Sequence, residues 1–154
     1  MSTFRLTLFA AAAICFAGSI CNAADPAVIY RASGVLDDGG NPNAGTATVF
    51  HCTNYGKTDT KLRVLLYNGT GLVVADMSLV VESNITRSFS SHQTLAFEDY
   101  VWATPGPIKQ GSAKIMSTSL AVVCSGAVVP ADATIPQGTP LHLSRFNEAT
   151  GQED

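Results

Sequence analysis

The sequence predicts an all-β fold built from antiparallel strands. Short segments alternate apolar and polar residues along most of the chain, as strands do when one face of a sheet is buried. Clusters of Gly, Asn, Asp and Pro separate these segments at short intervals. No stretch after the first 24 residues shows a convincing helical period. Several short strands with regular turn signals are typical of a β-sandwich or a β-barrel.

The first half of the domain carries the clearest strand patterns. We expect strands over Ala27–Ser33, Thr46–Cys52, Lys61–Tyr67, Leu72–Val81 and Ile85–Ser90. Residues 37–43 are dense in turn formers, and Asn68-Gly69 supplies the positive φ that a tight hairpin turn requires. In the second strand, Phe50 and Cys52 share one face and His51 lies on the other, because strand side chains alternate.

The second half is less regular. Leu95–Trp102 fits either a strand or a short helix, and the proline-rich stretch after it ends the element in both cases. Further strands are expected over Ser112–Thr118, Leu120–Val129 and Leu141–Phe146. The second of these is almost continuously apolar, as is typical of a central strand, and the third should lie at an edge. Residues 147–154 are polar, and we expect a flexible tail there.

Residues 1–24 have the pattern of a secretory signal peptide. Arg5 gives a short positive region, an apolar run covers residues 6–17, and small residues lead to a cleavage site at Ala23 or Ala24. The protein is therefore expected to be periplasmic or secreted. After the leader, no apolar run approaches the roughly 20 residues that a membrane-spanning helix needs.

The leader decides how the cysteines are interpreted. Cys15 and Cys21 leave with it, so Cys52 and Cys124 remain in residues 25–146, which we expect to form a single β-sandwich domain. Two distant cysteines in an oxidising compartment most often pair. Both lie in apolar strands, and few strands precede the first of them. This placement predicts a disulfide that crosses the core between two sheets.

Such an arrangement resembles immunoglobulin-like domains, in which a disulfide joins two packed antiparallel sheets. The resemblance implies an antiparallel immunoglobulin-like β-sandwich with one inter-sheet disulfide. The sequence departs from that family at two positions. The only tryptophan, Trp102, comes long after the first cysteine, and Val122 stands where a tyrosine precedes the second. The resemblance therefore extends to the architecture and not to the family.

Three segments also resemble uncharacterised small exported bacterial proteins. They are Thr48–Asn54, Gly111–Ile115 and Leu141–Asn147. The resemblance implies a bacterial origin and export from the cytoplasm, and it implies no activity.

The candidate contact surface is aromatic. Phe97, Tyr100 and Trp102 offer large apolar area with polar handles, as is typical of binding sites, and we expect them near one end of the sandwich. Glu98 and Asp99 would give this surface an acidic character. The alternative is that all three aromatic side chains belong to the core.

The same carboxylates support an enzymatic alternative. Paired carboxylates run acid–base chemistry on sugars when burial separates their pKa values, so Glu98 and Asp99 are candidates in an enzyme acting on an envelope polymer or glycan. A serine hydrolase is not indicated. The chain has no Gly-x-Ser-x-Gly motif, and the neighbours in Ser90-Ser91-His92 point apart on a strand.

A second alternative is periplasmic metal binding. Three histidines, His51, His92 and His142, could hold zinc or copper. No pair of them has the close spacing that makes a ligand motif specific, and His51 is expected to face solvent. The preferred interpretation is scattered surface histidines, with no metal and no cofactor.

The sequence as a whole predicts an exported, non-catalytic β-sandwich domain with a binding or structural role in the cell envelope. No convergent set of catalytic residues is apparent, so we do not expect an enzyme. The partner is an unknown protein or envelope polymer. Nucleic acid is not expected, because loss of Arg5 makes the chain more acidic than its net charge of −3 and leaves no basic stripe. No membrane span is expected after leader removal.

Overall fold

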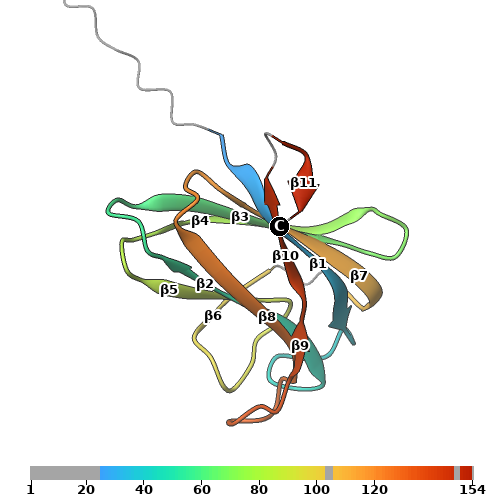
Figure 1. Ribbon diagram of the computed structural model, residues 1–154. Coiled ribbons are helices and arrows are strands. Elements are labelled where there is room, and N and C mark those ends of the chain that lie inside the picture. Colours follow the sequence, from blue (N-terminus) through green and yellow to red (C-terminus); the bar gives the residue numbers. More distant parts are fainter. Residues whose placement is uncertain (1–24, 103–105, 148–149, 154) are drawn as a thin grey trace, which may run out of the picture.

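The computed structural model describes residues 25–102, 106–147 and 150–153, which form two β-sheets packed face to face (Figure 1). The larger sheet consists, in spatial order, of β11 (Gln152–Glu153), β10 (Leu143–Asn147), β1 (Ala27–Asp37), β7 (Ile108–Ser117), β3 (Thr60–Tyr67) and β4 (Val73–Val81). The smaller sheet consists of β6 (Asp99–Val101), β5 (Thr86–Ser90), β2 (Thr46–Asn54), β8 (Val122–Pro130) and β9 (Thr139–Leu141). The predicted signal peptide, residues 1–24, lies outside the described residues.

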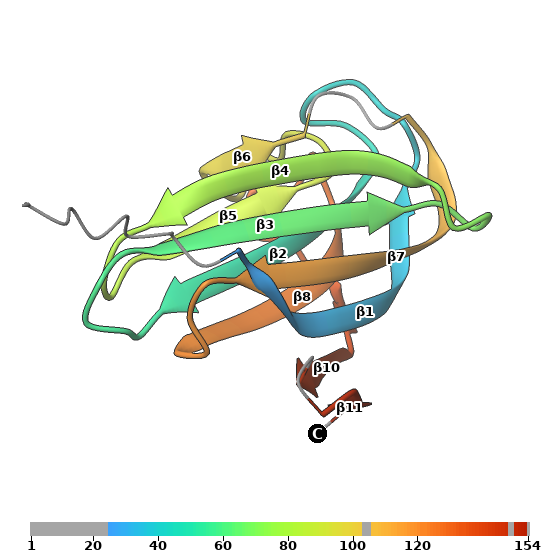
Figure 2. The ribbon, with the colours of Figure 1, turned by 90° about the horizontal axis from the view of Figure 1, so that it is seen from above.

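Neighbouring strands are antiparallel everywhere except between β5 and β6, which run parallel. Figure 2 shows β4, β3, β7 and β1 side by side as one layer, with β5, β2 and β8 behind them. The all-β, predominantly antiparallel two-sheet fold is therefore confirmed. In the part of the chain that the structure describes, no helix is long and apolar enough to cross a membrane.

Both sheets contribute to one apolar core. The side chains of Leu62, Val64 and Leu66 in β3 are fully buried, whereas the residues between them are half-buried or exposed, as the alternating sequence predicts. From the other sheet, Phe50 and Phe89 are also fully buried. Burial of these large side chains supplies the main driving force for packing the two layers.

The first strand is longer than expected. Strand β1 continues to Asp37, although the sequence suggested an end at Ser33. Gly34 has a φ of 83°, and the register against β7 shifts between Ser33 and Val35. A glycine in this region of φ allows a bulge without steric cost, so the strand bends and resumes instead of ending.

The end of the chain also differs from expectation. The single strand expected over Leu141–Phe146 is divided, because β9 pairs with β8 in one sheet and β10 pairs with β1 in the other. Within the predicted flexible tail, Gln152 pairs with Asn147 and extends the larger sheet. The segment Leu95–Trp102, for which the sequence fitted either a strand or a short helix, contains the three-residue strand β6 and no helix.

The disulfide between Cys52 and Cys124 is confirmed, but its predicted position between the sheets is wrong. The two cysteines face each other directly on the neighbouring strands β2 and β8, with their Cα atoms 4.2 Å apart. Alternation places Cys52 on the same face as the buried Phe50. Sequence periodicity assigns a residue to a face, and it does not reveal which strands become neighbours. The immunoglobulin-like likeness thus stays a prediction.

Removing the disulfide should lower stability without changing the fold. The bond links residues 72 positions apart, and the chain-entropy treatment of such a loop gives about 4 kcal/mol. We expect Cys52→Ala/Cys124→Ala to lose about 2–4 kcal/mol of unfolding free energy in urea and to keep its β-type circular dichroism spectrum. Reductant should destabilise the wild-type protein and leave the variant unchanged. Equal stability of the wild-type protein and the variant in the absence of reductant would contradict the prediction.

Candidate functional site

The connection between β5 and β6, residues 91–98, lies against the outer face of the smaller sheet. Strand alternation directs His51 of β2 away from the core, on the face opposite Cys52. Phe97 packs edge-on against the His51 ring, with ring centroids 4.5 Å apart. The connection therefore covers part of a sheet face that the sequence analysis expected to be open to solvent.

Hydrogen bonds at Ser91 and Leu95 fix the first half of this connection to neighbouring segments. The backbone N–H of Ser91 donates to the Thr48 carbonyl, and the Ser91 hydroxyl accepts from the Thr48 N–H, each at 2.9 Å. Three residues past His92, the Leu95 N–H donates to the Ala131 carbonyl at 2.9 Å. Ser91 and Thr48 are fully buried, and such buried polar groups are tolerated because their partners are present.

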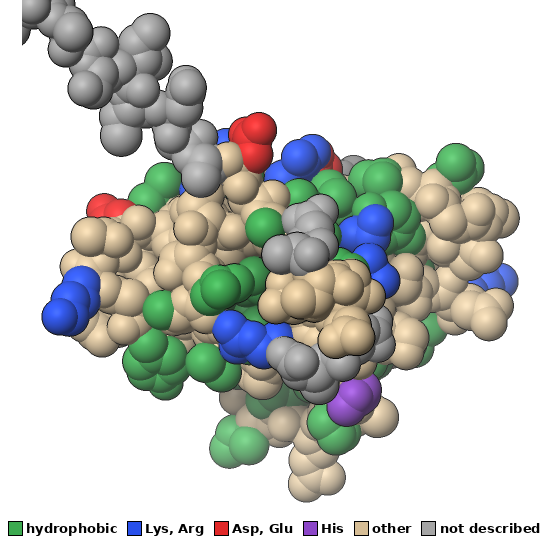
Figure 3. Space-filling model, turned by 45° about the horizontal axis from the view of Figure 1, so that its top comes forward, with side chains coloured by type: hydrophobic (Ala, Val, Ile, Leu, Met, Phe, Trp, Pro, Cys, Tyr) green, Lys and Arg blue, Asp and Glu red, His purple; other side chains and the backbone are tan. Residues whose placement is uncertain are grey.

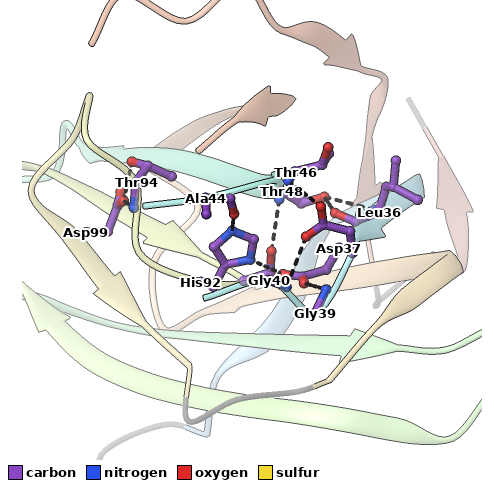
Figure 4. Close-up of polar contacts among 12 residues, drawn as sticks. Leu36, Asp37, Gly39, Gly40, Ala44, Thr46, Thr48, His92, Thr94 and Asp99 are labelled. Atoms are coloured by element: carbon purple, nitrogen blue, oxygen red, sulfur yellow. Dashed lines mark hydrogen bonds and ion pairs between the residues drawn. The ribbon is translucent and has the colours of Figure 1, made fainter. Parts of the chain in front are cut away.

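A buried contact between His92 and Asp37 fixes the same segment (Figure 4). Nδ1 of His92 lies 2.9 Å from Oδ2 of Asp37, and Nε2 lies 2.9 Å from the carbonyl oxygen of Ala44. A carboxylate or carbonyl oxygen accepts a hydrogen bond from a ring nitrogen that carries a hydrogen. The other Asp37 oxygen accepts from the Gly39 N–H at 2.7 Å. Both carboxylate oxygens of Asp37 thus have partners within the protein.

This pair belongs to the one cluster of potential metal ligands found among the described residues, formed by Asp37, Asp38 and His92. All of its donor atoms already have protein partners. The two carboxylate oxygens of Asp38 accept from the Gly40 and Thr46 N–H groups, each at 3.0 Å. The cluster therefore links the β1–β2 loop to the segment after β5 through hydrogen bonds.

The three histidines considered as a metal site do not come together in the described structure. His92 is committed to Asp37, and His51 bonds to the Ser88 hydroxyl at 2.8 Å. His142 stands between β9 and β10, where it lines a separate pocket with Arg31 and other residues. The arrangement offers no common ligand position for these imidazoles.

A pocket of about 540 Å³ opens beside the last two strands of the smaller sheet, and we call it the β5–β6 pocket. It is lined by Arg87, Gln93, Phe97, Glu98, Asp99, Tyr100 and Val101. It thus combines two aromatic rings with a guanidinium group, two carboxylates and a primary amide. Gln93, Phe97 and Glu98 come from the connection that the buried anchors hold, and the other lining residues come from β5 and β6.

Two of the charged side chains that line the pocket, Arg87 and Asp99, have partners within the protein. Two hydrogen bonds of 3.1 and 3.0 Å join Arg87 to Glu82, and the guanidinium lies 5.6 Å from the centre of the Tyr100 ring. One oxygen of Asp99 accepts from the hydroxyl and the N–H of Thr94, at 2.6 and 3.2 Å. These contacts orient the groups before any ligand arrives.

The His51 ring packs against Phe97, one of the residues that line the pocket. His51 is half-buried, although the sequence analysis expected it to face solvent. Its burial lowers the pKa of the imidazole from the ordinary 6.5, and the nearby negative charge of Asp99 partly opposes this effect. Burial thus favours the neutral ring beneath Phe97. The sequence offered no signal for this contact, because the covering segment was expected to be a strand or a helix.

Of the three aromatic residues expected at a contact surface, two line the pocket. Tyr100 is 41% exposed and Phe97 is half-buried, with Glu98 and Asp99 between them in the chain. Trp102 is only 2% exposed and packs against Phe89 in the core, so the expectation of an accessible tryptophan is wrong.

Sequence reasoning missed Arg87 and Gln93 as pocket residues. Arg87 lies at the pocket because its strand, β5, pairs in parallel with β6, which carries Tyr100. In this pairing Phe89 of β5 stands beside Tyr100. The local sequences of the two strands do not indicate this pairing.

No protein-family model matches the sequence, and comparison with curated proteins found no relative. Among solved structures, the chain is similar to the crystal structure of Thermotoga maritima 1070, with 13% sequence identity and a TM-score of 0.46. The match covers 79% of this chain and 94% of that chain. A likeness at this level supports no inference about function.

The burial of His51 predicts a pH dependence of stability. Because the folded state lowers its pKa below 6.5, the unfolded chain binds the proton more readily, and stability falls as the pH drops through 6.5 toward the folded value. Urea unfolding measured between about pH 7.5 and 5 should show a smaller loss for His51→Gln than for the wild-type protein. Thr53→Gln on the same face is the control and should keep the wild-type slope. Identical slopes in all three proteins would refute the assignment.

Proposed function

We propose that this protein is an exported, non-catalytic β-sandwich domain that binds a saccharide polymer of the cell envelope in the β5–β6 pocket. The observation that carries the proposal is that the aromatic rings of Phe97 and Tyr100 line one opening together with the charged side chains of Arg87 and Glu98. A sugar ring has an apolar C–H face and a rim of hydroxyl groups. Aromatic rings suit the first, and ionised or amide side chains suit the second.

The fixed geometry of the pocket favours binding. Arg87 is already held by Glu82, Asp99 by Thr94, and Phe97 rests against His51. Side chains that are ordered in the free protein lose little conformational entropy when a ligand binds. A modest number of contacts is then sufficient for measurable affinity.

Export and a bacterial envelope location are parts of the same proposal. The leader-like pattern of residues 1–24 supports export to the periplasm or the medium. The Cys52–Cys124 disulfide is typical of oxidising compartments. The immunoglobulin-like likeness also belongs here, and the two packed antiparallel sheets support it, although the disulfide joins strands of one sheet.

The enzymatic alternative, in which Glu98 and Asp99 act as acid and base on a glycan, has less support from the geometry. One Asp99 oxygen is occupied by Thr94, and the other is enclosed without a hydrogen-bond partner in the described structure. A general acid or base must reach the reacting atom within hydrogen-bond distance. Only Glu98 of the two is exposed.

Binding to cell-wall sacculi tests the proposal. We expect the purified protein to sediment with purified peptidoglycan sacculi, and we expect Tyr100→Ala to bind at least about tenfold more weakly, because a central aromatic contact is worth more than 1 kcal/mol. The affinity is read from the fraction of protein in the pellet over a series of sacculus concentrations.

Tyr55→Ala is the matched control, since Tyr55 is 64% exposed and lies outside the pocket. It should bind like the wild-type protein, and both variants should keep wild-type melting temperatures. Equal affinities of the two variants, or no sedimentation of the wild-type protein with sacculi, would contradict the proposal.

A further inference from the structure

Strand β4 forms an open edge of the larger sheet. It pairs with β3 on one side, and no strand of the described residues pairs with its other side. Figure 2 shows the strand running along the margin of its layer. An open edge of nine residues presents unpaired N–H and C=O groups that another strand can complete. Val73 and Val80 are 52% and 57% exposed and add apolar surface there.

The devices that usually block an open edge are weak in β4. The strand contains no Pro and no Lys, and its one charged residue is Asp76. Two hydrogen bonds of 2.9 and 2.6 Å join Asp76 to Arg63 of the neighbouring β3. The carboxylate is thus compensated within its own chain and does little to repel an approaching strand.

The sequence of β4 is complementary to itself in one antiparallel register. A two-fold axis perpendicular to a sheet can pair only residues that share a face, and an axis at Met77 meets this condition. Asp76 then faces Ser78 of the second copy, and a hydroxyl can donate to the carboxylate. The neighbouring register, with the axis at Asp76, would place two carboxylates directly opposite each other, which is unfavourable.

We propose that two copies of this chain associate through β4, in antiparallel register about Met77, so that the two larger sheets become one continuous sheet. Main-chain hydrogen bonds close both edges, and the pairing of Asp76 with Ser78 selects the register. The inference does not depend on the proposed function. If both hold, the dimer presents two β5–β6 pockets to a polymer and gains avidity.

Sedimentation-velocity ultracentrifugation over a concentration series tests the dimer. We expect a reversible monomer–dimer equilibrium for the wild-type protein. Ser78→Asp sets two like-charged pairs across the axis and should raise the dissociation constant at least about tenfold. The fold should tolerate it, because Ser78 is exposed and pairs with Arg63 in β3. Ser33→Asp, at an exposed position of β1, adds the same charge and should leave the equilibrium unchanged.

A charge exchange makes the test specific for the register. The double variant Asp76→Ser/Ser78→Asp restores one Asp–Ser pair on each side of the axis, and its dissociation constant should return toward the wild-type value. A wild-type protein that stays monomeric up to its solubility limit would overturn the proposal. So would a dimer that Ser78→Asp does not weaken.

Cross-linking gives an independent readout. In this register Met77 meets its own copy, with Cα atoms about 4.5–5.5 Å apart, a separation that a disulfide can span. Met77→Cys should therefore form a covalent dimer on mild oxidation, whereas Ser78→Cys, which faces Asp76, should form much less. Equal cross-linking of the two variants, or none at Met77→Cys, would overturn the register.

Discussion

The buried contact between His92 and Asp37 is the interaction on which the candidate site depends. Taking polar side chains out of water is costly unless their hydrogen-bonding groups find partners. Here the Gly39 N–H and the Ala44 carbonyl complete the pair. The β1–β2 loop and the segment after β5 must therefore adopt one relative position, because any other would leave a buried polar side chain without its hydrogen-bond partner.

That position determines where the pocket lies. His92 anchors the start of the β5–β6 connection, and Trp102 anchors its end by inserting its side chain into the core. The backbone N–H of Trp102 also donates to the Ser90 carbonyl at 3.3 Å. Between these two anchors the chain presents Phe97 and Tyr100 to the outside. The tryptophan that the sequence suggested as a contact residue thus holds the loop that carries the other two aromatic side chains.

The sequence predicted what depends on local alternation. Leu62, Val64 and Leu66 are buried because every second residue of a strand faces the same layer, and this period is visible without a structure. Pairing between distant strands is not local. The sequence therefore could not place Cys52 beside Cys124 within one sheet, and it could not bring Arg87 next to Tyr100.

Hydrogen exchange at individual amides tests most directly whether the buried anchors fix the β5–β6 connection. The N–H groups of Ser91, Leu95 and Trp102 are bonded to carbonyl groups of other segments, so they should exchange about as slowly as amides of β3. His92→Leu leaves Asp37 without its ring donor, and it should accelerate exchange at these three amides more than in β3. Exchange in the wild-type protein as fast as in an open loop would contradict the account, and so would an unchanged pattern in His92→Leu.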